Sequence, residues 1–334
     1  MTSMLKTLVL ACAALPVLAM PMSIAQAADP STITFTGGGP QGRWFLQASL
    51  FSKILDRELP QTSFSAVTGK GNSVGLIKKV NANQAQLGFA QAYHIDDALK
   101  HAGPFENDKT DYSQVVAWFT LDVNIMNVIG DASIKSFADL KGKRISIGQR
   151  GSGDDYECKI LLNAHGINDD NAKFVYATRG DASEQLTNGQ LDALCSPFTR
   201  NNRGFLAGLF SARPIGTDVE YIPQDPEALA AISAKYPQYI VDRGGEPAFD
   251  RQAGGPVNMD RMAYAMVATA RQDLPEDFVY RMTQILFSNW EEVQAQAPWM
   301  KEHNGPEFAA SADFVPFHPG AVKFFKEKRV WKKQ

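Results

Sequence analysis

Three glycine-rich segments have the residue types and spacing needed to bind a ligand. Residues 37–44 (GGGPQGRW), 68–73 (TGKGNS) and 149–154 (QRGSGD) each follow a predicted strand and precede a predicted helix. A helix N-terminus presents backbone N–H groups without intrahelical acceptors and carries a partial positive charge, so it attracts anions. Glycine lets a ligand approach that backbone closely. Because segments at the carboxyl ends of strands share one edge of an open α/β sheet, we expect all three to face one cleft.

The first segment does not have a nucleotide-binding pattern. It lacks the Gly-Lys-Ser/Thr of a Walker loop, and it matches GxGxxG only loosely, with no acidic residue at the end of the next strand. The segment could bind a phosphate, but a carboxylate fits it better. The alternative interpretation is that the segment is a flexible surface turn that binds no ligand.

Arginines in and near these segments supply a second kind of anion contact. Arg43, Arg150 and Arg179 each carry a planar donor fork that matches a carboxylate. Arg43 fits equally well on the solvent face of the first helix. Of the aromatic pair Trp44 and Phe45, we expect one to contact the ligand and the other to pack under the helix. The sequence therefore predicts that at least one of the three arginines binds a carboxylate.

Acidic and hydroxyl residues of the second half complete the predicted site. Asp154 is more typical of a helix cap or first turn than of a ligand contact; if it does touch the ligand, the ligand carries an amine or a hydroxyl group. Residues 196–200 follow a predicted strand and should face the cleft. The predicted contact residues are Gly39, Gln41, Gly42, Arg43, Trp44, Phe45, Thr68, Gly71, Asn72, Ser73, Gln91, Tyr93, Gln149, Arg150, Gly151, Ser152, Gly153, Asp154, Arg179, Ser196 and Thr199.

Catalysis and metal binding lack a matching pattern. Ser73, Ser152 and Ser196 have no neighbouring histidine, and Cys195 has no evident partner base. The chain has no CxxC or HExxH, and its five histidines are isolated in the sequence. We therefore expect no catalytic residues, no metal and no cofactor, and we interpret the chain as a binding protein rather than an enzyme.

The elements that would position these residues alternate between strands and helices, which predicts an α/β fold with mostly parallel sheets. The first series has strands at 32–36, 63–67 and 86–90 and helices at 44–59 and 72–83. The second series has strands at 144–148, 173–176 and 191–196 and helices at 153–164 and 182–188. The second series repeats the layout of the first without repeating its sequence, which predicts two similar lobes.

The chain is expected to cross between the lobes twice. Residues 115–120 and 125–129 read as two strands that lead out of the first lobe, and residues 262–270 read as a strand that returns. Residues 275–295 form one long predicted helix. The predicted division is residues 28–124 with 262–334 as lobe 1 and residues 125–261 as lobe 2, with a hinge at the crossings. A hinge between similar lobes leaves a ligand cleft between them.

The N-terminus has the parts of a secretory signal peptide. Lys6 precedes an apolar run over residues 7–20, and Ala25-Gln26-Ala27 forms an A-x-A site. Pro16 and the following polar residues leave the run below the roughly 20 apolar residues that a membrane span needs. We expect residues 1–27 to be removed, leaving a soluble periplasmic monomer. A membrane anchor, or a lipid on Cys12, is the alternative.

Charge and cysteines agree with export and exclude polyanion partners. The formal net charge is −3, and removing residues 1–27 takes away one base and no acid, so nucleic acid is not an expected partner. After removal, Cys158 and Cys195 remain in an oxidising compartment. The sequence leaves open whether they form a disulfide or stay as buried thiols.

These motifs resemble those of the TAXI solute receptors of tripartite ATP-independent periplasmic (TRAP) transporters. Residues 38–46 (GGPQGRWFL) follow the family's first loop, and residues 140–148 and 151–153 match its Leu-Lys-Gly-Lys-Arg-Val-Ser-Val-Gly and Gly-Ser-Gly closely. Residues 274–277 and 318–321 are similar to its late motifs. The resemblance implies a two-lobed type II periplasmic-binding-protein fold that closes on a dicarboxylate or an amino acid such as glutamate, and a TRAP membrane permease as partner.

The sequence departs from the family pattern inside the predicted site. Gln41, Arg43, Phe45 and Leu46 replace the family's usual residues, as do Ala92 and Tyr93 together. These changes leave the identity of the ligand open. A periplasmic sensor subunit for a receptor kinase, and an enzyme on the same two-lobed architecture, remain the alternative functions.

Overall fold

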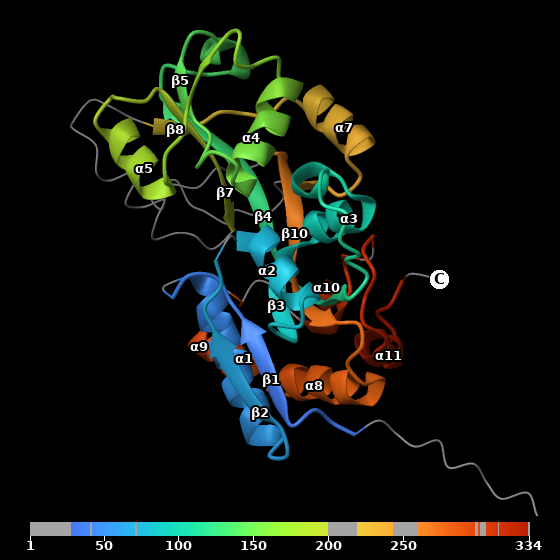
Figure 1. The fold of residues 1–334 in the computed structure, drawn as a ribbon. Helices are drawn as coiled ribbons and strands as arrows, with labels where there is room; N and C mark the ends of the chain where they lie inside the picture. The colour runs from blue at the N-terminus through green and yellow to red at the C-terminus, as the bar shows by residue number, and fades with distance from the viewer. Residues whose placement is uncertain are drawn as a thin grey trace, which may run out of the picture.

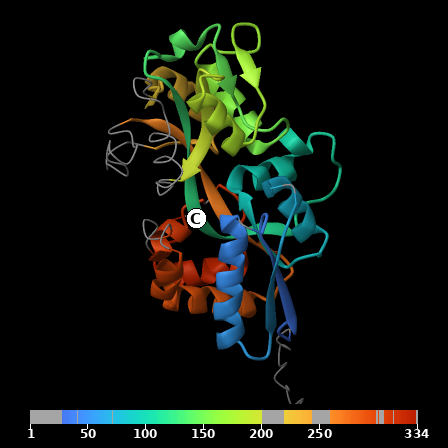
Figure 2. The ribbon, with the colours of Figure 1, turned by 90° about the vertical axis from the view of Figure 1, so that its left-hand side faces the viewer.

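The computed structural model describes residues 28–40, 42–70, 72–199, 219–242, 259–297, 300, 305–312 and 314–332. The predicted signal peptide lies outside the described residues. Figure 1 shows two halves, one above the other, and Figure 2 shows the same division from the side. No helix among the described residues combines the length and the apolar character that crossing a bilayer requires.

The lower half in Figure 1 contains the first predicted series. Its parallel strands lie in the order β2-β1-β3. Their apolar side chains pack against helices, as alternating strands and helices require. The elements are β1 (Thr32–Thr36), α1 (Arg43–Glu58), β2 (Ser63–Val67), α2 (Asn72–Asn81), β3 (Leu87–Gln91) and α3 (Ala92–Lys100), followed by the short 3₁₀ helix η1 (Gly103–Phe105).

The upper half repeats this arrangement with the parallel order β7-β5-β6. A disulfide between Cys158 and Cys195 joins its first helix to its last parallel strand, which answers the question that the sequence left open. The elements are η2 (Phe137–Leu140), β5 (Arg144–Ser146), α4 (Gly153–Ala164), β6 (Lys173–Val175), α5 (Arg179–Thr187) and β7 (Ala193–Thr199), then β8 (Val219–Tyr221), α7 (Pro226–Lys235) and β9 (Ile240–Asp242).

Two long antiparallel strands, β4 (Val115–Asp131) and β10 (Arg261–Arg271), run through both halves, and both views show them in the middle of the molecule. They join the two parallel sets into one sheet of order β2-β1-β3-β10-β4-β7-β5-β6. The C-terminal helices α8 (Glu276–Ser288), α9 (Trp290–Gln296), α10 (Gly305–Ala309) and α11 (Pro319–Glu327) return to the lower half. The fold is the predicted α/β architecture in two lobes.

The described core residues form separate hydrophobic clusters in the two halves. The largest contains buried residues from positions 33–121 and 265–325, and the next contains residues from 126–264 together with Tyr93. The predicted lobe boundaries stay a prediction, but the clusters divide close to them. Since β4 and β10 pass from one cluster to the other, they are the two chain crossings.

Three local predictions need correction. Residues 115–131 form one strand rather than two, because the polar residues Asp122 and Asn124, which interrupt the apolar pattern, remain paired with β10. The long helix predicted for residues 275–295 breaks at Asn289, whose side-chain amide donates to the carbonyl oxygen of Ile285. The strand predicted for residues 144–148 ends earlier, at Ser146, and Gly148 beyond it has a φ of 87°, outside the extended region.

Candidate ligand-binding cleft

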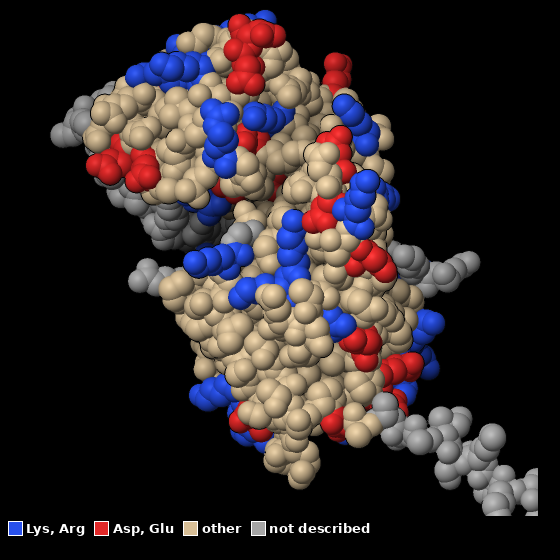
Figure 3. All heavy atoms as spheres, in the orientation of Figure 1, with Lys and Arg blue, Asp and Glu red and all other residues tan. Residues whose placement is uncertain are grey.

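A cavity of about 520 Å³ opens between the two halves, and its volume suits a small metabolite. The space-filling view shows an indentation between the halves on its left side, with basic side chains along the lower edge (Figure 3). The lining residues are Gly38, Gly39, Gly42, Arg43, Trp44, Gln47, Gly69, Asn72, Gln91, Asp122, Asn124, Asp154, Arg179, Pro197, Tyr264 and Met266.

Strand register explains why distant polar residues meet on one wall of the cleft. Met266 of β10 is paired with Gln91 of β3 on one side and with Asp122 of β4 on the other. Two residues along, Tyr264 of β10 is paired with Asn124. Because residues two apart on a strand share a face, these five side chains form one surface at the crossing strands.

The first glycine-rich segment provides free backbone donors. Within the described parts of the chain, the N–H groups of Gly38, Gly39 and Trp44 have no hydrogen-bond acceptor. Gly42 is the N-cap of α1 and has no side chain to cap the helix. The N-terminus of this 16-residue helix is therefore open toward the cleft, with the partial positive charge that favours an anion.

Gly69 is required by close packing between the first two segments. A Cβ atom at this position would lie 2.1 Å from Leu76 Cδ2 and 2.4 Å from the carbonyl oxygen of Gly37. Its own N–H donates to the carbonyl oxygen of Gly38 at 3.1 Å. The two segments are thus held against each other at the cleft, and only glycine fits between them.

The third segment and the helix that follows it satisfy some of their own backbone donors. The Ser152 hydroxyl accepts from the N–H of Asp155, and the Asp155 carboxylate accepts from the N–H of Gly151 at 2.8 Å. Helix α5 is capped in the same way by Thr178, which accepts from the N–H of Asp181. These two helices therefore have side-chain caps at their N-termini, whereas α1 has none.

Two arginines from opposite halves line the cleft. Arg43 begins α1, and Arg179 begins α5. Burial lowers the pKa of Arg43, the nearby Asp122 carboxylate raises it, and Arg179 lowers it again, so the two guanidinium groups act on each other across the cavity. Like charges in one cavity favour an anion between them.

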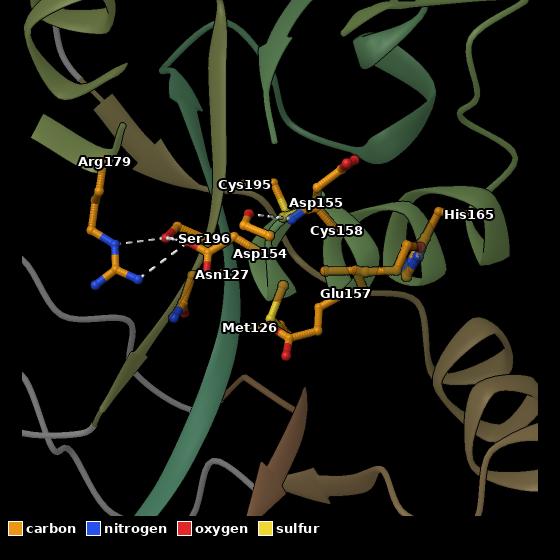
Figure 4. Close-up of a disulfide and its surroundings, with 12 residues drawn as sticks. Met126, Asn127, Asp154, Asp155, Glu157, Cys158, His165, Arg179, Cys195 and Ser196 are labelled. Carbon is orange, nitrogen blue, oxygen red and sulfur yellow. Dashed lines mark hydrogen bonds and ion pairs between the residues drawn. A yellow bond between two sulfur atoms is a disulfide. The ribbon is translucent and has the colours of Figure 1, made fainter. Parts of the chain in front are cut away.

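Hydrogen bonds to residues of the upper half hold the Arg179 side chain in place (Figure 4). Its Nε donates to the Ser196 hydroxyl at 2.9 Å and its Nη2 to the Asp154 carboxylate at 3.3 Å, while Ser196 also donates to Asp154 at 3.1 Å. The guanidinium group lies 5.1 Å from the centre of the Phe198 ring. No described residue accepts from Nη1, which leaves this donor available to a ligand.

Several predicted contact residues do not line the cavity. The Arg150 guanidinium stacks on the Tyr176 ring at 3.8 Å, and the Ser73 hydroxyl accepts from the N–H of Gln91. Tyr93 is fully buried because α3 turns it into the interior. The other described residues of the prediction that are not part of the cavity lining are Phe45, Thr68, Gln149, Gly151, Ser152, Gly153 and Ser196. Gln41, Gly71 and the side chain of Thr199 lie outside the described residues.

The sequence interpretation missed lining residues that come mainly from the interior of strands. Asp122, Asn124, Tyr264 and Met266 belong to β4 and β10, and Gln47 lies one turn into α1. The available signal was a pair of polar residues inside an otherwise apolar strand, at positions 122 and 124. Gly38, Gly69 and Pro197 were also missed, although they adjoin predicted residues.

A buried carboxyl group lies behind the cleft wall. Glu157 of α4 is fully buried and accepts from the Tyr264 hydroxyl at 2.7 Å and from the Tyr93 hydroxyl. The Tyr264 oxygen in turn accepts from Asn124 Nδ2 at 3.1 Å. Burial raises the pKa of Glu157 well above its usual value, and Asp154 raises it further. Glu157 therefore links α4, α3 and β10 where the halves meet.

Comparison with known proteins gives one family and a shared fold. A profile of the NMT1-like family matches residues 35–328. A putative periplasmic sulfonate-binding protein, SsuA from Methylobacillus flagellatus, has a TM-score of 0.51 at 14% identity, covering 92% of this chain and 98% of that one. PhnD1 from Prochlorococcus marinus, solved in complex with methylphosphonate, has a TM-score of 0.50 at 11% identity, covering 81% of this chain and 91% of that one. At these identities the likeness concerns the fold.

Proposed function

The chain belongs to the NMT1-like family, and from this premise and its cleft we propose that it is an exported periplasmic solute-binding protein. It binds a small carboxylate metabolite between its lobes and delivers it to a membrane permease. The protein performs no chemistry on the solute. The resemblance to TAXI receptors supports a TRAP-type permease as the partner.

The observation that carries this proposal is the convergence of anion-binding groups from both lobes on one cavity. The lower lobe contributes Arg43 and the open N-terminus of α1, and the upper lobe contributes Arg179. A carboxylate presents two oxygens in one plane, which suits a guanidinium fork and adjacent backbone N–H groups. Because the donors belong to different lobes, a bound carboxylate would draw the lobes together.

A thermal-shift screen of the purified mature protein tests the proposal. The probes are four- to six-carbon dicarboxylates, amino acids and keto acids, with methylphosphonate and an alkanesulfonate as tetrahedral anions. A ligand at 100 times its dissociation constant stabilises the folded protein by about 2.7 kcal/mol. Stabilisation by at least one carboxylate supports the proposal. Stabilisation by the tetrahedral anions alone, or by none of the probes, contradicts it.

A further inference from the structure

We propose that the protein takes up a proton as it binds its solute, and that the carboxyl group of Glu157, behind the wall of the cleft, holds this proton. The proton comes from bulk water, binds one carboxylate oxygen of Glu157 and returns to water when the solute leaves. The inference rests on the proposed function, because it concerns an anionic solute in this cleft, and it adds a dependence of binding on pH. Three features lead to it: the position of Glu157, the lack of a counter-charge beside it, and the nearby charges that a bound anion would change.

A single hydrogen bond connects Glu157 to the lining of the cavity. Its Oε2 accepts from the Tyr264 hydroxyl at 2.7 Å, and the Tyr264 oxygen accepts from Asn124 Nδ2 at 3.1 Å. Tyr264 and Asn124 both line the cavity. On its other side, Glu157 Oε1 accepts from the Tyr93 hydroxyl, so the carboxyl group joins α4 of the upper half to α3 as well as to β10. Glu157 therefore lies where the halves meet, directly behind a surface that a solute would contact.

No counter-charge contacts this carboxyl group. Glu157 is fully buried, and no lysine, arginine or histidine among the described residues forms an ion pair with it. His94, which follows Tyr93 on α3, stays neutral because burial lowers its pKa to about 3. Burying a carboxylate without a counter-charge is unfavourable. A protonated carboxyl group fits the same place, since it has one O–H that donates and one oxygen that still accepts.

The titratable groups around Glu157 come from several elements. They are Asp154 and Tyr156 on α4, Tyr93 and Asp97 on α3, Tyr264 on β10, Arg179 at the start of α5, and Tyr239 before β9. Burial raises the pKa of each tyrosine, so the tyrosines stay neutral. Burial also raises the pKa of Asp97 to about 6, but this residue is not part of the cavity lining. Of the charged residues that line the cavity, Asp154 and Arg179 act on Glu157.

A bound anion would change the charge that acts on Glu157. Burial raises the pKa of Glu157 and the Asp154 carboxylate raises it further, whereas the tyrosine hydrogen bonds and Arg179 lower it. Arg179 Nη2 donates to the Asp154 carboxylate at 3.3 Å, and Asp154 lies one turn before Glu157 on α4 (Figure 4). A solute carboxylate on Arg179 would add a negative charge and weaken the effect of the guanidinium group on both acids. Both changes favour the protonated form of Glu157.

Proton binding and solute binding must then strengthen each other equally. A coupling free energy between two sites is reciprocal, so a solute that favours the protonated form of Glu157 is itself bound more tightly by that form. Couplings of this kind are typically about 5- to 150-fold in affinity. The protein should therefore bind its solute more tightly at acidic than at alkaline pH.

Calorimetry in buffers of different ionisation enthalpy measures proton uptake and affinity together. The probe is whichever of 2-oxoglutarate, succinate and glutamate binds most tightly, since their carboxylates stay ionised above about pH 6.5. Between about pH 6.5 and 9 we expect the affinity of the wild type to fall about tenfold, with an uptake of at least about half a proton per solute where the uptake is greatest. Binding without proton uptake overturns the inference and leaves the proposed function standing. If none of the three probes binds, the proposed function fails with it.

Two variants assign the proton to Glu157. Glu157→Gln resembles the protonated carboxyl group, so it should bind without proton uptake and should exceed the wild-type affinity about tenfold at the alkaline end of the range. A purely structural defect would weaken binding instead. The matched control Asp97→Asn removes another buried carboxyl group on α3, outside the cavity lining, and should keep the wild-type uptake.

If Glu157→Gln does not fold, Glu157→Met, which is also neutral and of similar length, carries the same expectation. Proton uptake that persists in the folded variant of Glu157, or that disappears in Asp97→Asn, overturns the assignment.

Discussion

Removing the Cys158–Cys195 disulfide should destabilise the upper lobe strongly. Both cysteines are fully buried, one on α4 and one on β7, and they are 37 residues apart in the sequence. Replacing both by alanine keeps the site apolar and releases the cross-link. The bond adjoins the cleft, because Asp154 lies one turn before Cys158 and Ser196 directly follows Cys195 (Figure 4).

The size of the effect follows from the length of the closed loop. In the chain-entropy treatment, a loop of this length contributes about 4 kcal/mol at room temperature through restriction of the unfolded chain. For a protein of this size each kcal/mol shifts the midpoint by about 2 to 4 °C, so the midpoint of thermal unfolding should fall by roughly 10 °C.

The assay is thermal and urea unfolding of the wild type and of the Cys158→Ala/Cys195→Ala variant, with and without reductant. The wild type, unfolded and refolded in reductant, should approach the variant, and reductant should leave the variant unchanged. A loss below about 1 kcal/mol in the variant would refute the argument, because cross-linking would then contribute little to stability.

Three further predictions follow from the described contacts. The pKa of Glu157 is raised in the folded protein, so the stability that this carboxyl group contributes is present below its ordinary pKa of 4.5 and is lost as the pH rises toward the folded value. Glu157→Gln keeps the shape of the side chain and stays neutral, so its stability relative to the wild type should increase between about pH 5 and 8. A stability difference in urea unfolding that stays constant across that range would contradict this prediction. In Gly69→Ala the free energy of unfolding should fall by about 1 to 3 kcal/mol, because the new Cβ is overpacked against Leu76 and Gly37. The control Gly39→Ala, where a Cβ has open space, should keep the thermal midpoint of the wild type. Similar midpoints for the two variants would show that the close packing at Gly69 does not affect stability. Saturating ligand should reduce the radius of gyration in small-angle scattering, since donors for the ligand come from both lobes; an unchanged radius would argue against closure.

The sequence was sufficient to predict the fold class because its local patterns agree with the global arrangement. Strands such as Thr32–Thr36 and helices such as Arg43–Glu58 have the apolar spacing of their final structure, and glycine segments separate them. The predicted ends of helices and strands were less accurate, because these ends depend on tertiary and side-chain contacts that a local sequence pattern does not contain. Asn289, for example, ends α8 through its own side-chain hydrogen bond.

The candidate site was predictable where it follows strand ends and not where it lies within strands. Arg43 and Arg179 stand at helix starts after strands, so local patterns indicated them. Asp122 and Tyr264 meet only because β4 and β10 pair in one register, and pairing between distant strands cannot be read from local periodicity. Arg150 shows the converse: its segment adjoins the cleft, yet tertiary stacking on Tyr176 directs its guanidinium group elsewhere.

The most direct test of the central claim is calorimetry of Arg179→Ala, Arg43→Ala and Arg150→Ala with the best carboxylate from the screen. Loss of a buried donor to a carboxylate costs about 2 to 5 kcal/mol, or roughly 30-fold to several thousand-fold in affinity. We expect such a loss for at least one of Arg179→Ala and Arg43→Ala, with partial rescue by lysine, while Arg150→Ala stays near the wild type. If Arg179→Ala and Arg43→Ala both bind within about threefold of the wild type, the cleft arginines do not hold the ligand and the account is wrong.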